Sequence, residues 1–123
     1  MTTPSLGSAV PVLRIFDEQL ARRFYLDVLQ FETVWEHRFE PALPLYTRIR
    51  RDGAVLDLSG HHGDGTPGSL VLIPCADVEA LQSDVASRSD MQLRPEVDPD
   101  APGGPSLYLT DPFGNTLRFI EAS

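Results

Sequence analysis

Apolar residues at the start of the chain predict a buried strand followed by an amphipathic helix. The segment AVPVLRIF, residues 9–16, is apolar and β-branched, which is typical of a strand inside a sheet. Asp17 stands where its side chain can cap a helix that continues to about Leu29. The apolar residues of this helix recur every four positions, at Leu20, Phe24 and Val28. A strand-helix unit therefore opens the chain.

Three strands are predicted after this helix, and the same order of elements then begins again. The strands of the first half lie in FETVWEHRF, LYTRIRR and AVLDLSG, and Asp52-Gly53 favours a hairpin turn between the last two. After the glycine-rich segment HHGDGTPG, the pattern predicts a strand in SLVLIP, a helix capped by Asp77, and strands in MQLRPEV, SLYLT and TLRFIE. The sequence therefore predicts one α+β domain over all 123 residues, built from two tandem β-α-β-β-β modules at about residues 8–60 and 68–121.

The last strands of the two modules align residue by residue, AVLDLS with NTLRFI. In this alignment Asp57 matches Arg118, and Tyr46 of the first module is matched with Tyr108 of the second. Strand alternation places the apolar neighbours on the helix-covered face and leaves Asp57 and Arg118 on the opposite face. Because an unpaired arginine in a partly desolvated cleft is costly, we expect Asp57 and Arg118 to form an ion pair, within one chain or across a dimer.

The duplicated module and the closing segment LTDPFGNTLRF resemble the vicinal oxygen chelate superfamily, which contains glyoxalase I, extradiol dioxygenases, fosfomycin resistance enzymes and bleomycin resistance proteins. The segments SAVPVL and RRDGAVLDLS are similar to segments of the bleomycin resistance proteins, which makes that group the closest resemblance. The resemblance implies a curved mixed sheet around a concave cleft. It also implies a homodimer in which the N-terminal strand preceding Pro11 exchanges between subunits.

The resemblance also indicates where a metal would bind. In metal-dependent members the ligands come from the first and last strands of each module, and these positions fall on Val10, Asp57, Ser69 and Arg118. Only Asp57 could ligate strongly, because valine has no donor atom and a cationic arginine repels a divalent ion. We therefore expect no metal, no cofactor and no catalytic residues at these positions.

Several residues are candidates for binding a small molecule on the concave face. They share an aromatic, charged or imidazole side chain and are Trp35, Phe39, Tyr46, Asp57, Tyr108, Arg118 and His62. The simpler interpretation is that the aromatic residues belong to the core or to hairpins, and that His61 and His62 lie in a solvated loop. Gly103 stands where the bleomycin resistance proteins carry a tryptophan that stacks on the drug. The aromatic platform for the drug is therefore missing, although the implied architecture is the same.

Charge and composition limit the partners. The net charge of −8 and the pI near 4.6 argue against nucleic acid and favour a neutral or cationic small ligand. The resemblance implies that this ligand is aromatic or cationic. No run of about 20 apolar residues is present that could cross a bilayer, so we expect no membrane partner. Neither a secretory signal nor a second cysteine to pair with Cys75 is present, and both observations favour a cytoplasmic location. Cys75 itself is expected to be a buried, inert thiol.

Two functions from different classes remain open at this point. The first is a metal-independent protein that sequesters a small molecule in a concave cleft at a dimer interface, as bleomycin resistance proteins do. The second is a metal-dependent lyase or dioxygenase of the glyoxalase type, with a site rebuilt from Asp57 and one or both of His61 and His62. The loss of the expected metal ligands favours the first.

Overall fold

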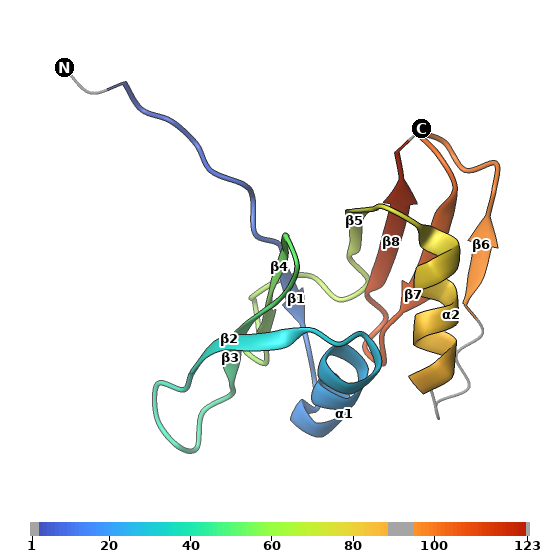
Figure 1. Cartoon of the computed structure of the whole chain (residues 1–123). Coiled ribbons are helices and arrows are strands. Elements are labelled where there is room, and N and C mark those ends of the chain that lie inside the picture. The colour runs from blue at the N-terminus through green and yellow to red at the C-terminus, as the bar shows by residue number, and fades with distance from the viewer. Residues whose placement is uncertain (1–2, 89–94, 123) are drawn as a thin grey trace.

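Each half of the chain forms one four-stranded sheet with a helix on one side (Figure 1). The computed structural model describes residues 3–88 and 95–122. The first module contains β1 (Val12–Arg14), α1 (Glu18–Arg22) continued by the π-helical η1 (Arg23–Val28), β2 (Glu32–His37), β3 (Tyr46–Arg51) and β4 (Ala54–Ser59). The second contains β5 (Leu70–Cys75), α2 (Val78–Arg88), β6 (Glu96–Asp98), β7 (Ser106–Thr110) and β8 (Thr116–Glu121). The strand orders, β1-β4-β3-β2 and β5-β8-β7-β6, are the same, which confirms the duplicated α+β module.

The local signals for helices and strands are also confirmed. Asp17 accepts a 3.0 Å hydrogen bond from the amide of Leu20, and Asp77 accepts one of the same length from Ala80 at the start of α2. The strand expected in MQLRPEV is found as β6, which begins at Glu96, and residues 91–94 of that segment lie outside the described residues. No helix within residues 3–88 and 95–122 is long and apolar enough to cross a membrane.

The strand registers confirm the alignment of Asp57 with Arg118. Parallel pairing sets Val12 opposite Asp57 in the first sheet and Leu72 opposite Arg118 in the second. The alignment of Tyr46 with Tyr108 is wrong, because Tyr108 stands opposite Arg118 whereas the residue opposite Asp57 is Arg48.

The error has its origin in the hairpin turns. In the first module Arg51 pairs directly with Ala54, so that only Asp52 and Gly53 form the turn. In the second module Thr110 pairs with Thr116 across a longer loop. Because the turns differ, the residue of β3 that corresponds to Tyr108 of β7 is Arg48, two positions after Tyr46.

One apolar core is shared by the two modules. The inner faces of both sheets and the helices contribute to it, and its fully buried members include Leu13, Phe24, Tyr25, Val28, Leu56, Val85, Leu107 and Leu117. The opposite face of each sheet, which we call its outer face, therefore points away from this core. Residues 3–10 leave the first module as an extended arm (Figure 1).

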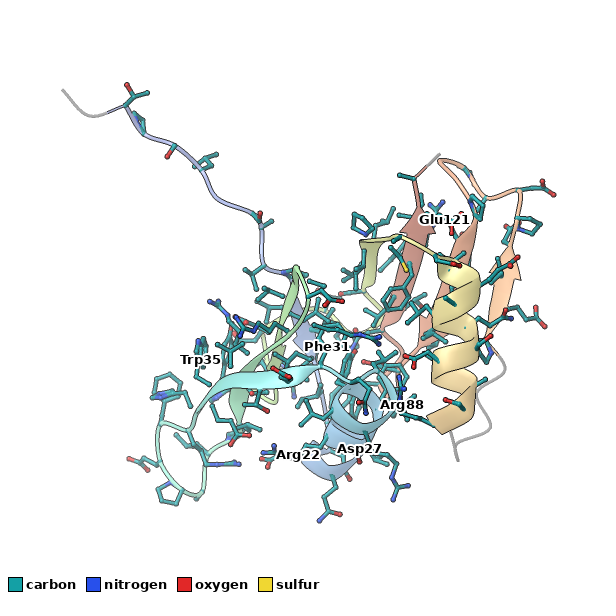
Figure 2. The ribbon with its side chains drawn as sticks, in the orientation of Figure 1. Arg22, Asp27, Phe31, Trp35, Arg88 and Glu121 are labelled. Atoms are coloured by element: carbon teal, nitrogen blue, oxygen red, sulfur yellow. The ribbon has the colours of Figure 1, made fainter. Side chains whose placement is uncertain are left out.

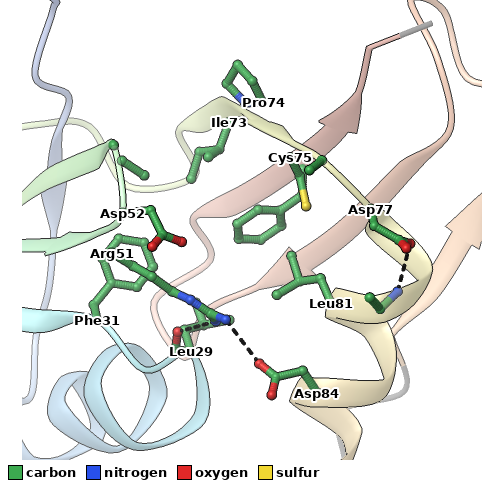
Figure 3. Close-up of a pocket in the computed structure, with 15 residues that line it drawn as sticks. Leu29, Phe31, Arg51, Asp52, Ile73, Pro74, Cys75, Asp77, Leu81 and Asp84 are labelled. Carbon is green, nitrogen blue, oxygen red and sulfur yellow. Dashed lines mark hydrogen bonds and ion pairs between the residues drawn. The ribbon is translucent and has the colours of Figure 1, made fainter.

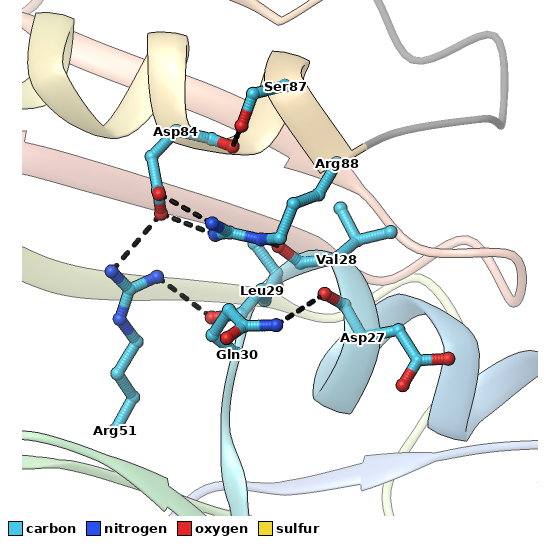
Figure 4. Close-up of polar contacts among 8 residues, drawn as sticks. All are labelled: Asp27, Val28, Leu29, Gln30, Arg51, Asp84, Ser87 and Arg88. Carbon is cyan, nitrogen blue, oxygen red and sulfur yellow. Dashed lines mark hydrogen bonds and ion pairs between the residues drawn. The ribbon is translucent and has the colours of Figure 1, made fainter.

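Two arginines hold the modules together beside the end of η1 (Figure 4). Arg51 of β3 donates to the carbonyl of Leu29 at 2.8 Å and to Asp84 of α2 at 3.2 Å. Arg88 donates to the carbonyl of Val28 at 3.1 Å and, through a second nitrogen, to Asp84 at 2.6 Å. Cations at the C-terminus of a helix are favourable because they bind its unpaired carbonyls. The carboxylate of Asp84 thus connects arginines from both modules.

Candidate functional site

Four side chains form a cluster on the outer face of the first sheet: Trp35, Tyr46, Arg48 and Asp57. The rings of Trp35 and Tyr46 are stacked, with centroids 5.7 Å apart and an interplanar angle of 12°. The guanidinium carbon of Arg48 lies 5.0 Å from the centroid of Trp35. Figure 2 shows Trp35 beside β2, on the side of the first module remote from α2. We call these four residues the outer-face cluster. Trp35 is 39% exposed, so the aromatic surface of the cluster is open to solvent.

A β-bulge brings Trp35 to this face. Thr33 pairs with Ile49 and Trp35 pairs with Arg48, which makes Val34 an extra residue in β2. Ile49 is buried in the core, so in a regular strand Trp35 would share the inward direction of Thr33. Bulges re-aim side chains in this way and are frequent next to functional sites.

The carboxylate of Asp57 lies at the centre of the cluster and is only 3% exposed. Arg48 donates to it from Nε at 2.7 Å and from Nη2 at 3.1 Å, and the Tyr46 hydroxyl donates at 2.5 Å. Desolvation and the hydrogen bond to Asp57 raise the pKa of Tyr46 to about 12. The hydrogen bond with Asp57 also raises the pKa of Arg48. The charge of Asp57 is therefore neutralised inside its own sheet.

The predicted ion pair between Asp57 and Arg118 is wrong for a single chain. The partner of Asp57 is Arg48, which stands directly opposite on the neighbouring strand. Arg48 is not among the binding residues predicted from the sequence. Strand alternation along β3 predicts that Arg48 lies on the same face as Tyr46. Only the pairing of β3 with β4 shows that Arg48 also lies beside Asp57.

Arg118 lies on the outer face of the second sheet with neutral partners. Its Nε donates to the hydroxyl of Ser106 at 3.0 Å, and its Nη2 donates to the carbonyl of Pro102. Its guanidinium carbon is 5.8 Å from the centroid of Tyr108. Of the ion pairs between residues that the structure describes, none includes Arg118. Large apolar side chains are exposed on the same sheet, at Leu70, Leu72 and Tyr108.

The remaining predicted residues lie apart from both groups. Phe39 is 68% exposed in the loop after β2, where its ring meets His37 edge-on at 4.4 Å and His61 at 5.6 Å. His62 is exposed in the segment that joins the modules. The structure thus brings together Trp35, Tyr46 and Asp57 of the predicted set, and places Tyr108 and Arg118 on the other sheet.

The residues at the expected metal positions do not fit a divalent ion. Both oxygens of Asp57 are bound by Arg48, and the hydroxyl of Ser69 donates to the carbonyl of Thr66 at 2.6 Å. Arg118 brings a positive charge and no lone pair, and Val10 has no donor atom. Within the described ranges no group of three or more His, Cys, Asp and Glu side chains is placed to hold a metal.

A separate groove of about 830 Å³ lies between the modules, bounded by the β3–β4 turn, β5 and α2 (Figure 3). Its floor is apolar and includes Phe31, Ile73 and Phe119, which are buried in the core. The thiol of Cys75 lines this groove and is half-buried, so the expectation of a buried cysteine holds only in part. None of the predicted ligand-binding residues lines it.

The comparisons with known proteins identify the class to which this architecture belongs. A family model described as glyoxalase superfamily protein matches residues 4–123. The chain therefore belongs to the glyoxalase superfamily, and the resemblance drawn from its sequence is confirmed. A comparison with curated proteins gives no match.

Solved structures share the fold at low sequence identity. A putative glyoxalase family protein from Bacillus anthracis is 14% identical with a TM-score of 0.75, and the match covers 100% of both chains. The bleomycin-binding protein from bleomycin-producing Streptomyces verticillus, solved with copper(II)-bleomycin, is 23% identical with a TM-score of 0.71 over 98% of this chain and 100% of that one. TnmS3, an antibiotic binding protein from Streptomyces sp. CB03234, is 20% identical with a TM-score of 0.69 over 98% and 100%.

Proposed function

We propose that the protein is a metal-independent binding protein that sequesters a small molecule between the outer faces of two different chains in a homodimer. The observation that carries the proposal is the solvent-open stack of Trp35 on Tyr46, with Arg48 packed against the same indole. Large aromatic surface held rigidly in water is a typical contact for a flat ligand. The solved relatives that bind bleomycin or another antibiotic have the same fold, which supports binding as the activity.

The position of the outer faces supports a dimer. Both faces point away from the core that the modules share, so they do not enclose a cleft within one chain. In the proposed dimer the second sheet of one copy faces the first sheet of its neighbour, and the exposed apolar residues of β5 lie at the cleft between them. Leu70 is 58% exposed and Leu72 is 52% exposed on β5, which is an edge strand.

The extended arm of residues 3–10 supports exchange between the subunits. Leu6 in this arm is 98% exposed, and the arm leaves the first module just before Pro11. Exchange of this segment would bury Leu6 on the other chain. The cytoplasmic location stays a prediction.

The alternative enzyme would require Asp57 to change partners. Its carboxylate is held by the guanidinium of Arg48 and the hydroxyl of Tyr46. A divalent ion could bind only after these donors had been displaced, which would leave Arg48 unpaired. The geometry gives the binding function better support.

Two measurements test the proposal. Equilibrium sedimentation at micromolar concentration should show a dimer, and a thermal-shift screen with flat aromatic compounds, bleomycin included, should find a compound that raises Tm. Trp35→Ala should abolish that shift, whereas Phe16→Ala, which removes an aromatic side chain 61% exposed elsewhere, should keep it. A monomer, or an undiminished shift in Trp35→Ala, would contradict the proposal. Treatment with a chelator should leave both the shift and the Tm unchanged.

A further inference from the structure

We infer that the ligand of the proposed cleft is an apolar or aromatic molecule that carries a carboxylate or a similar anionic group, and that Arg118 binds this group. The inference rests on the proposed function and replaces the cationic ligand that the net charge of the chain had favoured. It follows from the different surroundings of two side chains in equivalent positions of the two modules.

Asp57 and Arg118 differ in the charge of their direct hydrogen-bond partners. Asp57 and Arg118 occupy the same position in the two modules, but only Asp57 has an oppositely charged partner, Arg48. A ligand that reaches Asp57 therefore meets a neutral pair. At Arg118 the partners are a hydroxyl and a carbonyl, which accept hydrogen bonds and leave the positive charge in place.

Two hydrogen bonds fix the orientation of the Arg118 guanidinium. Its Nε is fixed by Ser106, which is 0% exposed, and one terminal nitrogen is fixed by the carbonyl of Pro102. A guanidinium has five N–H donors, so others remain for a ligand. Because the group is already held in one orientation, it loses little conformational entropy when an anion binds. Charge-assisted hydrogen bonds of this type are about twice as strong as neutral ones.

An apolar surface lies beside Arg118 on the second sheet. Tyr108 lies next to the guanidinium, and Leu72 stands opposite Arg118 on β5. Both side chains are large and exposed. An isolated inorganic anion would leave this surface in water, whereas an organic acid covers it with its apolar body.

The residue at one of the expected metal positions also favours an anionic ligand. The resemblance drawn from the sequence implies a metal-ligand position at Arg118, and the residues present do not fit a metal ion. Here a guanidinium at this position supplies a positive charge from the protein itself.

The experiment compares two probes that differ only in charge. We would measure the affinity of 2-naphthoate and of 2-naphthamide for the full-length protein by isothermal titration calorimetry. The naphthoate should bind the wild type at least about tenfold more tightly than the amide. Its affinity should also fall as salt is added, since salt screens a partly exposed charge pair.

Variants then assign the effect to Arg118. Arg118→Gln should remove the preference for naphthoate, while Arg23→Gln, which deletes an equal charge at an exposed position of η1, should retain it. Arg118→Lys should keep part of the preference, and it serves as the second variant if Arg118→Gln does not fold, as judged by circular dichroism. Equal binding of the two probes to the wild type would overturn the inference, and so would an undiminished preference in Arg118→Gln.

The outcomes separate this inference from the proposed function. Binding of both probes with equal affinity, lost in Trp35→Ala, would retain the cleft and reject its anionic ligand. Absence of dimer and of any binding would reject both. If Arg118 instead pairs with Asp57 of a second chain, Arg118→Gln should dissociate the dimer and the wild type should show no preference for naphthoate, which also overturns the inference.

Discussion

The hydroxyl of Tyr25 donates a 2.6 Å hydrogen bond to the carboxylate of Asp111, and this contact joins the helix of the first module to the closing hairpin of the second. Asp111 is 4% exposed and also accepts hydrogen bonds from the amides of Phe113 and Asn115, each at 2.8 Å. The side chain of Asn115 donates both to Asp111 and to the carbonyl of Arg14. The DPFGN segment therefore does more than turn the chain, because its aspartate is the acceptor that both modules share.

Removal of the Tyr25 hydroxyl should destabilise the protein without changing its fold. Tyr25→Phe deletes one donor to a buried carboxylate, and hydrogen bonds to charged groups contribute about 1.5–3 kcal/mol. Denaturant unfolding should show a loss of this size. Tyr108→Phe is the matched control, because it removes the hydroxyl of a tyrosine that is 39% exposed. It should change the free energy of unfolding little.

Asp84 should make stability dependent on acid pH. The hydrogen bond from Arg88, with another from Arg51, lowers the pKa of Asp84 below its ordinary 3.8. The stabilisation is therefore present above pH 3.8 and is lost as the pH falls through the lowered pKa of the folded state. Asp84→Asn should cost roughly 1 kcal/mol at neutral pH, a small value because the side chain is about a third exposed. The difference between the variant and wild type should shrink when unfolding is repeated at about pH 2.

Tyr46 should make stability fall at alkaline pH. Its pKa in the folded state is raised from 10.0 to about 12, so its contribution is fully present below pH 10 and is lost as the pH rises towards 12. Spectrophotometric titration of tyrosinate should contain a component near pH 12 that is missing in Tyr46→Phe. If the component lost in Tyr46→Phe titrates near pH 10 instead, the hydrogen bond to Asp57 does not persist in solution.

Two glycines of the segment that joins the modules should respond differently to alanine. Both have positive φ angles, +95° at Gly63 and +66° at Gly65. A Cβ atom on Gly65 would lie 2.7 Å from the carbonyl oxygen of Val12, whereas one on Gly63 would meet nothing within 4 Å. Gly63→Ala should therefore cost about 1 kcal/mol from backbone strain alone, and Gly65→Ala should cost clearly more. Equal losses of Tm would contradict the close packing of this segment against β1.

Local patterns were enough to predict the helices, the strands and their order. Asp17 and Asp77 cap helices through bonds to residues three positions away, which the sequence shows directly. The surroundings of Trp35 and Asp57 depend on pairing between strands. The bulge in β2 and the register of β3 on β4 arise from contacts across the sheet. The spacing of residues along one strand therefore does not predict them.

The placement of the outer faces on opposite sides of one core has a consequence for mixed assemblies. In the proposed homodimer each cleft takes its Trp35 face from one chain and its Arg118 face from the other. When chains with Trp35→Ala are combined with chains with Arg118→Gln, one cleft of each mixed dimer contains both substitutions and the other contains neither. Two defective variants should therefore restore the preferential binding of naphthoate to half of the sites in every mixed dimer, as in complementation between defective alleles of one gene.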